Sequence, residues 1–164
     1  MDVHIKGSAE DVRLGDIDEV YHKIERILLP TDGSAPSVAA TEYAVMLAKT
    51  FGASVKAIYV DTGLEALEYP EEVMDEDVYE GVHALVKGLV LAKTMCERNG
   101  VSCEVEVVQG GVAKRIVRVA EEWEADMIVV GDTGRTGLKR IALGSVAETV
   151  VKAAPIPVLV VKAE

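Results

Sequence analysis

Residues 127–134 read Met-Ile-Val-Val-Gly-Asp-Thr-Gly, and after nine further residues the chain continues with Gly144-Ser145 and a helical pattern. An apolar run that ends in glycines is typical of a buried strand leading into a tight loop. Glycines at such a point let backbone N–H groups approach an oxyanion, and the amino end of the next helix adds partial positive charge. The pattern therefore predicts a phosphate-binding loop.

A purely structural interpretation of the same stretch stays open. Ser145 and Glu148 have the Ser-x-x-Glu spacing of a capping box, in which two side chains satisfy the amide groups at the start of a helix. In that case the glycines only shorten the connection between strand and helix. The residues of this stretch alone do not decide between the two interpretations.

Outward from this stretch, strand-like apolar runs alternate with amphipathic helical patterns. The expected strands are 24–29, 54–60, 101–108, 126–130 and 157–161, and the expected helices are 36–51, 78–98, 112–123 and 145–154. This alternation predicts an α/β fold, in which right-handed crossovers build a five-stranded parallel sheet with helices on both faces. Ligands of such sheets bind beyond the carboxyl ends of the strands. We therefore expect the loops 30–34, 60–61 and 131–145 to converge on one site.

The chain has 164 residues, of which 49% are hydrophobic and only 4% aromatic, which suits one domain with an aliphatic core. The net charge of −11 argues against a nucleic-acid partner. The segment 61–80 holds nine acidic residues and no basic one, and we interpret it as a solvated loop with a short helical piece. No apolar run approaches the ~18 residues of a membrane span, and no signal peptide is recognisable, so we expect a cytoplasmic protein without a membrane partner.

Residues 1–22 are polar and lack a sustained period, so we expect a flexible N-terminal extension, helical in part between 12 and 21, before a domain of residues 23–164. Cys96 and Cys103 have neither zinc nor disulfide spacing, and we interpret them as small buried hydrophobic residues. His4 and His22 have no second ligand at a suitable spacing. No metal site is predicted.

The motifs together resemble those of the universal stress protein family, over residues 24–162. They are Ile-Leu-Leu-Pro-Thr-Asp-Gly-Ser at 27–34, Val-Val-Gly at 129–131, the spacing Gly131-x2-Gly134-x9-Gly144-Ser145, and Pro-Val-Leu-Val-Val at 157–161. The glycine spacing resembles that of the nucleotide-binding branch of the family. The resemblance implies a Rossmann-like sheet of strand order 3-2-1-4-5, an adenine nucleotide as ligand, and a homodimer formed through the last strand, residues 157–161.

The resemblance also assigns roles to individual residues. Asp32 matches the acid that contacts the ribose, and its neighbours Pro30 and Thr31 form a wall of the adenine pocket. Val60 matches the residue whose backbone hydrogen-bonds adenine. The remaining expected contacts surround the phosphates and are Gly131, Thr133, Gly134, Gly144, Ser145 and Val146. The implied ligand is ATP or AMP, with Mg²⁺ carried by the phosphates.

One position departs from the family pattern. Between its first two glycines the family usually has Ser or Thr followed by His or Arg, whereas this chain has Asp132-Thr133. A carboxylate repels phosphates unless a cation lies between them. Arg135, Lys139 and Arg140 would offset this repulsion, or Asp132 points to solvent or helps to hold Mg²⁺. The departure favours AMP or ADP more than is usual for the family.

Three functions are compatible with these residues. The leading hypothesis is an adenine-nucleotide-binding regulatory protein of the stress-response type. The chain has no Walker A lysine, and the sequence places no His or Glu to activate water, so a slow ATPase is the weaker alternative. The third is a dimeric interaction module that binds no nucleotide.

Overall fold

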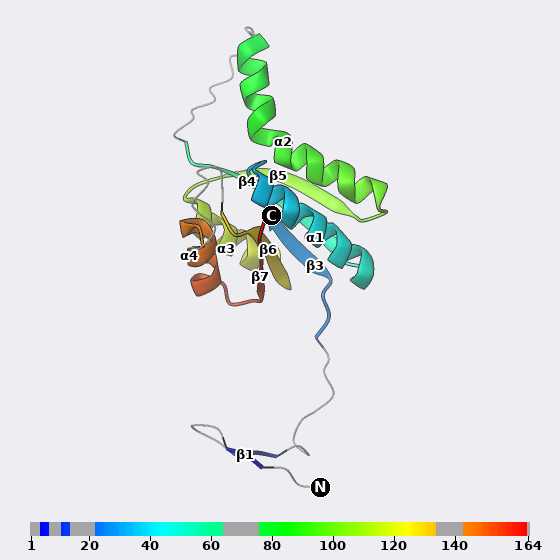
Figure 1. Ribbon diagram of the computed structural model, residues 1–164, viewed down its shortest axis with the longest axis vertical. Coiled ribbons are helices and arrows are strands. Elements are labelled where there is room, and N and C mark those ends of the chain that lie inside the picture. The colour runs from blue at the N-terminus through cyan, green and yellow to red at the C-terminus, as the bar shows by residue number, and fades with distance from the viewer. Residues whose placement is uncertain (1–3, 7–10, 14–21, 64–75, 134–142, 164) are drawn as a thin grey trace.

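A five-stranded parallel sheet is the centre of the computed structural model, which describes residues 4–6, 11–13, 22–63, 76–133 and 143–163 (Figure 1). Along the chain, the strands of this sheet are β3 (Arg26–Pro30), β4 (Ser54–Asp61), β5 (Cys103–Gln109), β6 (Met127–Gly131) and β7 (Val158–Val161). Side by side they run in the order β5-β4-β3-β6-β7. Counted within the sheet, this is the expected order 3-2-1-4-5.

Four helices cover the two faces of the sheet, which gives the expected three layers (Figure 1). They are α1 (Ala35–Phe51), α2 (Glu76–Arg98), α3 (Val112–Glu122) and α4 (Ser145–Ala153). Helices α1 and α2 pack on one face, and α3 and α4 pack together on the other.

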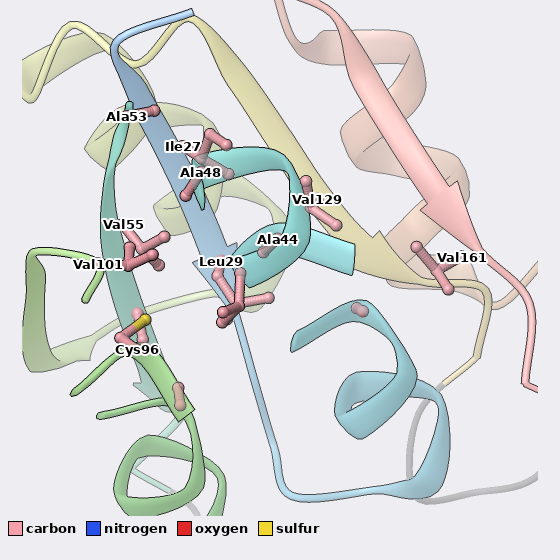
Figure 2. Packing of buried hydrophobic residues seen from close by; sticks show 14 of the residues in the cluster. Ile27, Leu29, Ala44, Ala48, Ala53, Val55, Cys96, Val101, Val129 and Val161 are labelled. Atoms are coloured by element: carbon pink, nitrogen blue, oxygen red, sulfur yellow. The ribbon is translucent and has the colours of Figure 1, made fainter. Parts of the chain in front are cut away.

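The sheet is buried on both faces at its centre. Along β3, Ile27 and Leu29 belong to the core under α1 and α2, while Leu28 belongs to the core under α3 and α4. Figure 2 shows the first of these cores, where Ala44 and Ala48 of α1 lie over the strands. A strand with both faces buried reads as a continuous aliphatic run, which is why Ile27-Leu28-Leu29 shows no alternation.

Every strand and helix expected between residues 23 and 164 is present, with ends displaced by no more than two residues. The alternation in 101–108 had indicated an exposed face or an edge, and β5 is indeed an edge strand. On it Val105 and Val107 are 44% and 50% exposed. At the opposite edge lies β7, next to β6.

The first residues contain a short antiparallel pair, β1 (His4–Lys6) and β2 (Asp11–Arg13), which forms a sheet of its own. Val12 lies in β2, so the helix expected between 12 and 21 does not begin there, and residues 14–21 lie outside the described part. Of the acidic segment, residues 64–75 also lie outside it, while Asp61 ends β4 and Glu76 begins α2. Among the residues that the structure describes, no helix is long and apolar enough to cross a bilayer.

Candidate functional site

A cavity of about 480 Å³ lies where the carboxyl ends of β3, β4 and β6 meet. The neighbouring strands β3 and β6 pair only at Ile27 with Met127 and at Leu28 with Ile128, and their last residues separate. Crossovers leave this point of a doubly wound sheet in opposite directions, which opens a crevice beyond the strand ends. The residues lining the cavity are Pro30, Thr31, Asp32, Ser37, Ile58, Tyr59, Val60, Thr62, Val112, Ile116, Val130, Gly131, Thr133, Gly144, Ser145, Val146 and Ala147.

Most of the site residues predicted from the sequence line this cavity. Pro30, Thr31, Asp32, Val60, Gly131, Thr133, Gly144, Ser145 and Val146 all line it. Gly134, the remaining residue of the expected set, lies outside the described residues, as do Arg135, Lys139 and Arg140. Segments separated by about a hundred residues thus form one wall, as expected from the parallel topology.

The loop after β3 is held by one hydrogen bond to β4 and by hydrogen bonds within the loop and the first turn of α1. The Thr31 amide donates to the Ile58 carbonyl over 2.9 Å. The Thr31 hydroxyl donates to Ser37 Oγ at 3.2 Å, and Ser37 Oγ donates in turn to the Ser34 carbonyl at 2.9 Å. Asp32 Oδ1 accepts the Ser34 N–H at 3.0 Å, an Asx turn that orients the carboxylate before α1 begins.

The backbone of Val60 faces the cavity because β4 is longer than its neighbour β3. In a parallel sheet, successive residues direct their N–H and C=O groups to alternate sides. The Ile58 carbonyl accepts from Thr31 on the β3 side, and the Asp61 carbonyl accepts from Gly110 on the β5 side. Val60 is therefore directed to the β3 side, two residues beyond the last pair, Pro30 with Ile58. Its N–H and C=O have no strand partner there among the described residues.

Two glycines of the glycine motif, Gly131 and Gly144, are required by the packing of the protein itself. A Cβ atom on Gly131 would lie 2.7–2.8 Å from backbone and side-chain atoms of Pro36, in the first turn of α1. A Cβ atom on Gly144 would lie 3.2 Å from both Asp132 O and Thr133 Cα, and the Gly144 amide donates to Asp132 O at 2.7 Å. Gly131 thus brings the start of α1 against the end of β6, and Gly144 brings the start of α4 against the residues that follow β6.

The capping-box interpretation of Ser145 and Glu148 is wrong. The N-cap of α4 is Gly144, one residue earlier, and it makes no side-chain cap hydrogen bond. Glu148 Oε1 instead accepts from Lys152 Nζ at 2.7 Å, one turn further along the helix. The first-turn residues Ser145 and Val146 line the cavity, and among the described residues no side chain caps this helix end, an arrangement that suits anions at helix amino ends.

Comparison with known proteins decides the family. A model of the universal stress protein family matches residues 23–162. The universal stress protein MJ0531 of Methanocaldococcus jannaschii is 46% identical over 143 residues, a match that covers 84% of this chain and 82% of the relative. The chain belongs to the universal stress protein family.

Solved structures of universal stress proteins share the fold. The structure of protein MJ0577, described as a structure-based assignment of biochemical function, has a TM-score of 0.68 and 30% identity, over 87% of this chain and 99% of that one. A universal stress protein in complex with cAMP has a TM-score of 0.66 and 26% identity, over 85% of this chain and 98% of that one. The α/β fold predicted from the strand alternation and the Rossmann-like sheet implied by the resemblance are thereby confirmed.

Asp132, the departure from the family pattern, does not line the cavity of this universal stress protein. Its amide donates to Val161 O at 2.9 Å, its carbonyl accepts from Gly144, and its carboxylate accepts the Thr133 hydroxyl at 3.3 Å. Within the described residues, no three His, Cys, Asp or Glu side chains gather as a metal site would require. Asp32 is the one carboxylate among the described lining residues.

The sequence analysis did not predict several residues that form or support the site. Val112 and Ile116 of α3 line the cavity, although their helical stripe indicated only core packing. Ser37 ties the β3 loop to α1. Gly88 of α2 packs against that loop, and a glycine inside a helical pattern was the available signal.

A second hollow of about 610 Å³ lies on the outer side of α3 and α4. Its lining includes the basic residues Lys114 and Arg118 and the acidic residues Glu121 and Glu122, all on α3. Its described lining comes from α3 and α4 alone, with no residue from the carboxyl ends of the strands. The strand-end cavity is therefore the better candidate.

Proposed function

We propose that this universal stress protein binds an adenine nucleotide in the strand-end cavity and acts as a regulatory nucleotide-binding protein. The observation that carries the proposal is the meeting of three different binding groups on one cavity. These groups are the open backbone edge of Val60, the carboxylate of Asp32 and the amino end of α4. Each suits a different part of a nucleotide.

The base would bind along β4. An amide N–H and a carbonyl two residues beyond the end of β3 offer one donor and one acceptor, which is the pair that the edge of adenine matches. The buried Ile58 and Val130 and the half-buried Val112 supply apolar surface for the ring faces. Specificity for adenine would thus come from main-chain groups.

The sugar and phosphate would bind at opposite sides of the opening between β3 and β6. The Asp32 carboxylate accepts hydrogen bonds from hydroxyl groups, as ribose requires. The first turn of α4 presents amide N–H groups and the hydroxyl of Ser145, which suit phosphate oxygens. The cAMP complex of a 26% identical universal stress protein gives this choice of ligand independent support.

Calorimetric titration with AMP, ADP and ATP, each with and without Mg²⁺, tests the proposal. We expect saturable binding of at least one of the three, and a dependence on Mg²⁺ would identify a triphosphate whose charge the metal offsets. Absence of binding at about 1 mM nucleotide, a weak-affinity limit, would overturn the proposal and favour the interaction module. Release of phosphate from ATP would add the slow ATPase.

Two variants test the contacts proposed for the ribose and for the phosphate separately. Asp32→Ala should cost about 1–3 kcal/mol of binding free energy for AMP, the range for a lost hydrogen bond to a charged group, and should leave binding of free adenine unchanged. Ser145→Ala should weaken AMP but not adenosine, because only AMP carries a phosphate. The control Glu42→Ala changes the same charge on the exposed side of α1 and should have no effect.

A homodimer through residues 157–161 is part of the same proposal. β7 is an edge strand, and Val158, Leu159 and Val160 on it are only partly buried. An uncovered apolar edge strand favours pairing with another chain, and a twofold axis would pair two copies of β7 antiparallel.

A further inference from the structure

The two cysteines of the chain lie together. Cys96 is in the last turn of α2, Cys103 begins β5, and only residues 97–102 join them. Cys96 is fully buried next to Val55 and Val101 (Figure 2), and the half-buried Cys103 packs against the same core. Both side chains pack against one core cluster, and the pKa of each thiol is shifted chiefly by the other thiol. Their interpretation as two separate apolar residues missed this contact.

The backbone holds both residues in place. The Val101 amide donates to the Cys96 carbonyl at 2.9 Å and so closes the turn after α2. Cys103 pairs with Val55 in the sheet, and Lys93 Nζ donates to the Cys103 carbonyl at 2.9 Å. Cys96 and Cys103 are therefore held by a helix end and a strand whose backbones are both fixed.

The contact makes the two thiols chemically different. The Cys103 thiol raises the pKa of Cys96, which keeps its proton, and burial acts in the same direction. The Cys96 thiol in turn lowers the pKa of Cys103, opposed by burial and assisted by the ammonium of Lys93. When protonated, Cys103 donates to the Glu104 carbonyl at 3.6 Å. Cys103, which solvent also reaches, is thus the nucleophile of the pair.

We propose that Cys96 and Cys103 form a reversible intramolecular disulfide when a peroxide oxidises the protein. The Cys103 thiolate attacks one peroxide oxygen, the O–O bond breaks, and the leaving hydroxide takes up a proton, which gives a sulfenic acid and water. The Cys96 sulfur then attacks the sulfenic sulfur, the S–O bond breaks, and the proton of Cys96 leaves with the hydroxide as a second water. Two thiols lose two electrons, and one peroxide gains them.

This pair is remote from the nucleotide cavity. Cys103 lies at the amino end of β5, whereas the cavity lies at the carboxyl ends of the strands. A disulfide there would link the end of α2 to the edge strand without touching a residue that lines the cavity. The proposal therefore stands or falls independently of nucleotide binding.

The test uses the full-length, reduced protein. It is treated with a small excess of hydrogen peroxide, free thiols are blocked with N-ethylmaleimide, and the mass of the chain is measured. Trypsin separates the cysteines, because it cuts after Lys93, Arg98 and Lys114 and leaves Cys96 in peptide 94–98 and Cys103 in peptide 99–114. We expect both thiols to be lost, the chain to lose the mass of two hydrogen atoms, and the two peptides to stay linked until dithiothreitol is added.

Three results would overturn the proposal: two thiols still free after peroxide, oxygen adducts on Cys103 without a link, or a link between two chains. Single variants assign the roles. In Cys103→Ser, Cys96 should stay reduced, and in Cys96→Ser, Cys103 should retain an oxygen adduct. If Cys96→Ser does not fold, Cys96→Ala replaces it, since alanine suits an apolar site. If Cys103 in Cys96→Ala gained no more oxygen adducts than Cys103 in the wild type, the assigned order of attack would be contradicted.

Discussion

Gly88 of α2 lies directly against Thr31 of the loop that follows β3. A Cβ atom on Gly88 would lie 2.3 Å from Thr31 Oγ1 and 2.8 Å from the amide nitrogen of Gly33, closer than real Cβ atoms approach. A glycine inside a helix costs about 1 kcal/mol relative to alanine, so its presence needs a reason. The contact supplies one: the helix backbone supports the loop that carries Asp32.

Gly88→Ala should therefore weaken AMP binding and destabilise the protein by about 1–3 kcal/mol, the range for overpacking. The added methyl group would displace Thr31 and with it the loop. Calorimetry measures the affinity, and urea unfolding measures the free energy of unfolding. Lys87→Ala, on the exposed neighbouring position, is the control. Unchanged AMP affinity in a folded Gly88→Ala protein would show that α2 does not position the loop.

Gly131→Ser should lower the free energy of unfolding by about 1–3 kcal/mol, because its side chain would meet Pro36 at 2.7–2.8 Å. The matched control is Gly111→Ser, where no atom lies within 4 Å of a Cβ and φ is −69°. Gly111 is the N-cap of α3, a position that serine suits, so that variant should be as stable as the wild type or slightly more so. Equal stability of the two variants would contradict the packing assigned to Gly131.

The dimer is tested by two proline substitutions on β7. Ile128 of β6 and Asp132, which directly follows β6, donate to the carbonyls of Pro157 and Val161, so Leu159 also faces β6 and Val160 faces the open edge. Val160→Pro removes an edge N–H and should convert dimers to monomers in light scattering, with the fold retained. Leu159→Pro removes a hydrogen bond inside the sheet and should unfold the protein. A wild type that is monomeric at a concentration of about 50 μM would exclude a dimer of useful strength.

Arg118 should control the titration of Glu122. The hydrogen bond from Arg118 Nε, at 2.8 Å, lowers the pKa of Glu122 below its ordinary value of 4.5. The stabilisation from a carboxylate with a lowered pKa is complete above the unfolded-state pKa and is lost as the pH falls through the folded-state pKa. NMR titration of Arg118→Ala should find the Glu122 pKa raised toward 4.5, with little change in stability because both side chains are exposed. An unchanged pKa would mean that the pair does not form in solution.

The layers were predictable because few residues decide them, whereas the strand order came from the family resemblance. Aliphatic runs such as Ile27-Leu28-Leu29 mark strands buried on both faces, and the alternation with helices leaves only parallel pairing. The convergence of Asp32, Val60 and Ser145 followed from the same topology, because carboxyl ends of parallel strands share one edge.

The remaining features depend on contacts between distant segments. The role of Gly88 depends on Thr31, 57 residues earlier in the chain. The contact of Cys96 with Cys103 depends on how the turn after α2 enters β5. The capping-box pattern at Ser145 failed because Gly144 already bonds to Asp132 and begins the helix one residue earlier. The short pair β1 and β2 lies in a polar stretch whose periodicity is too brief to detect.

The open edge of β4 has a consequence for how this site tolerates mutation. If a purine is read by the N–H and C=O of Val60, no ordinary substitution there removes either group, and only proline deletes the donor. Isoleucine or another aliphatic residue that fills the same buried space would keep the recognition intact. A saturation scan scored by AMP affinity should therefore find position 60 sensitive to size and polarity but not to chemical identity among aliphatic residues, unlike position 32. Residue identity at position 60 would then be a poor guide to which relatives share the ligand.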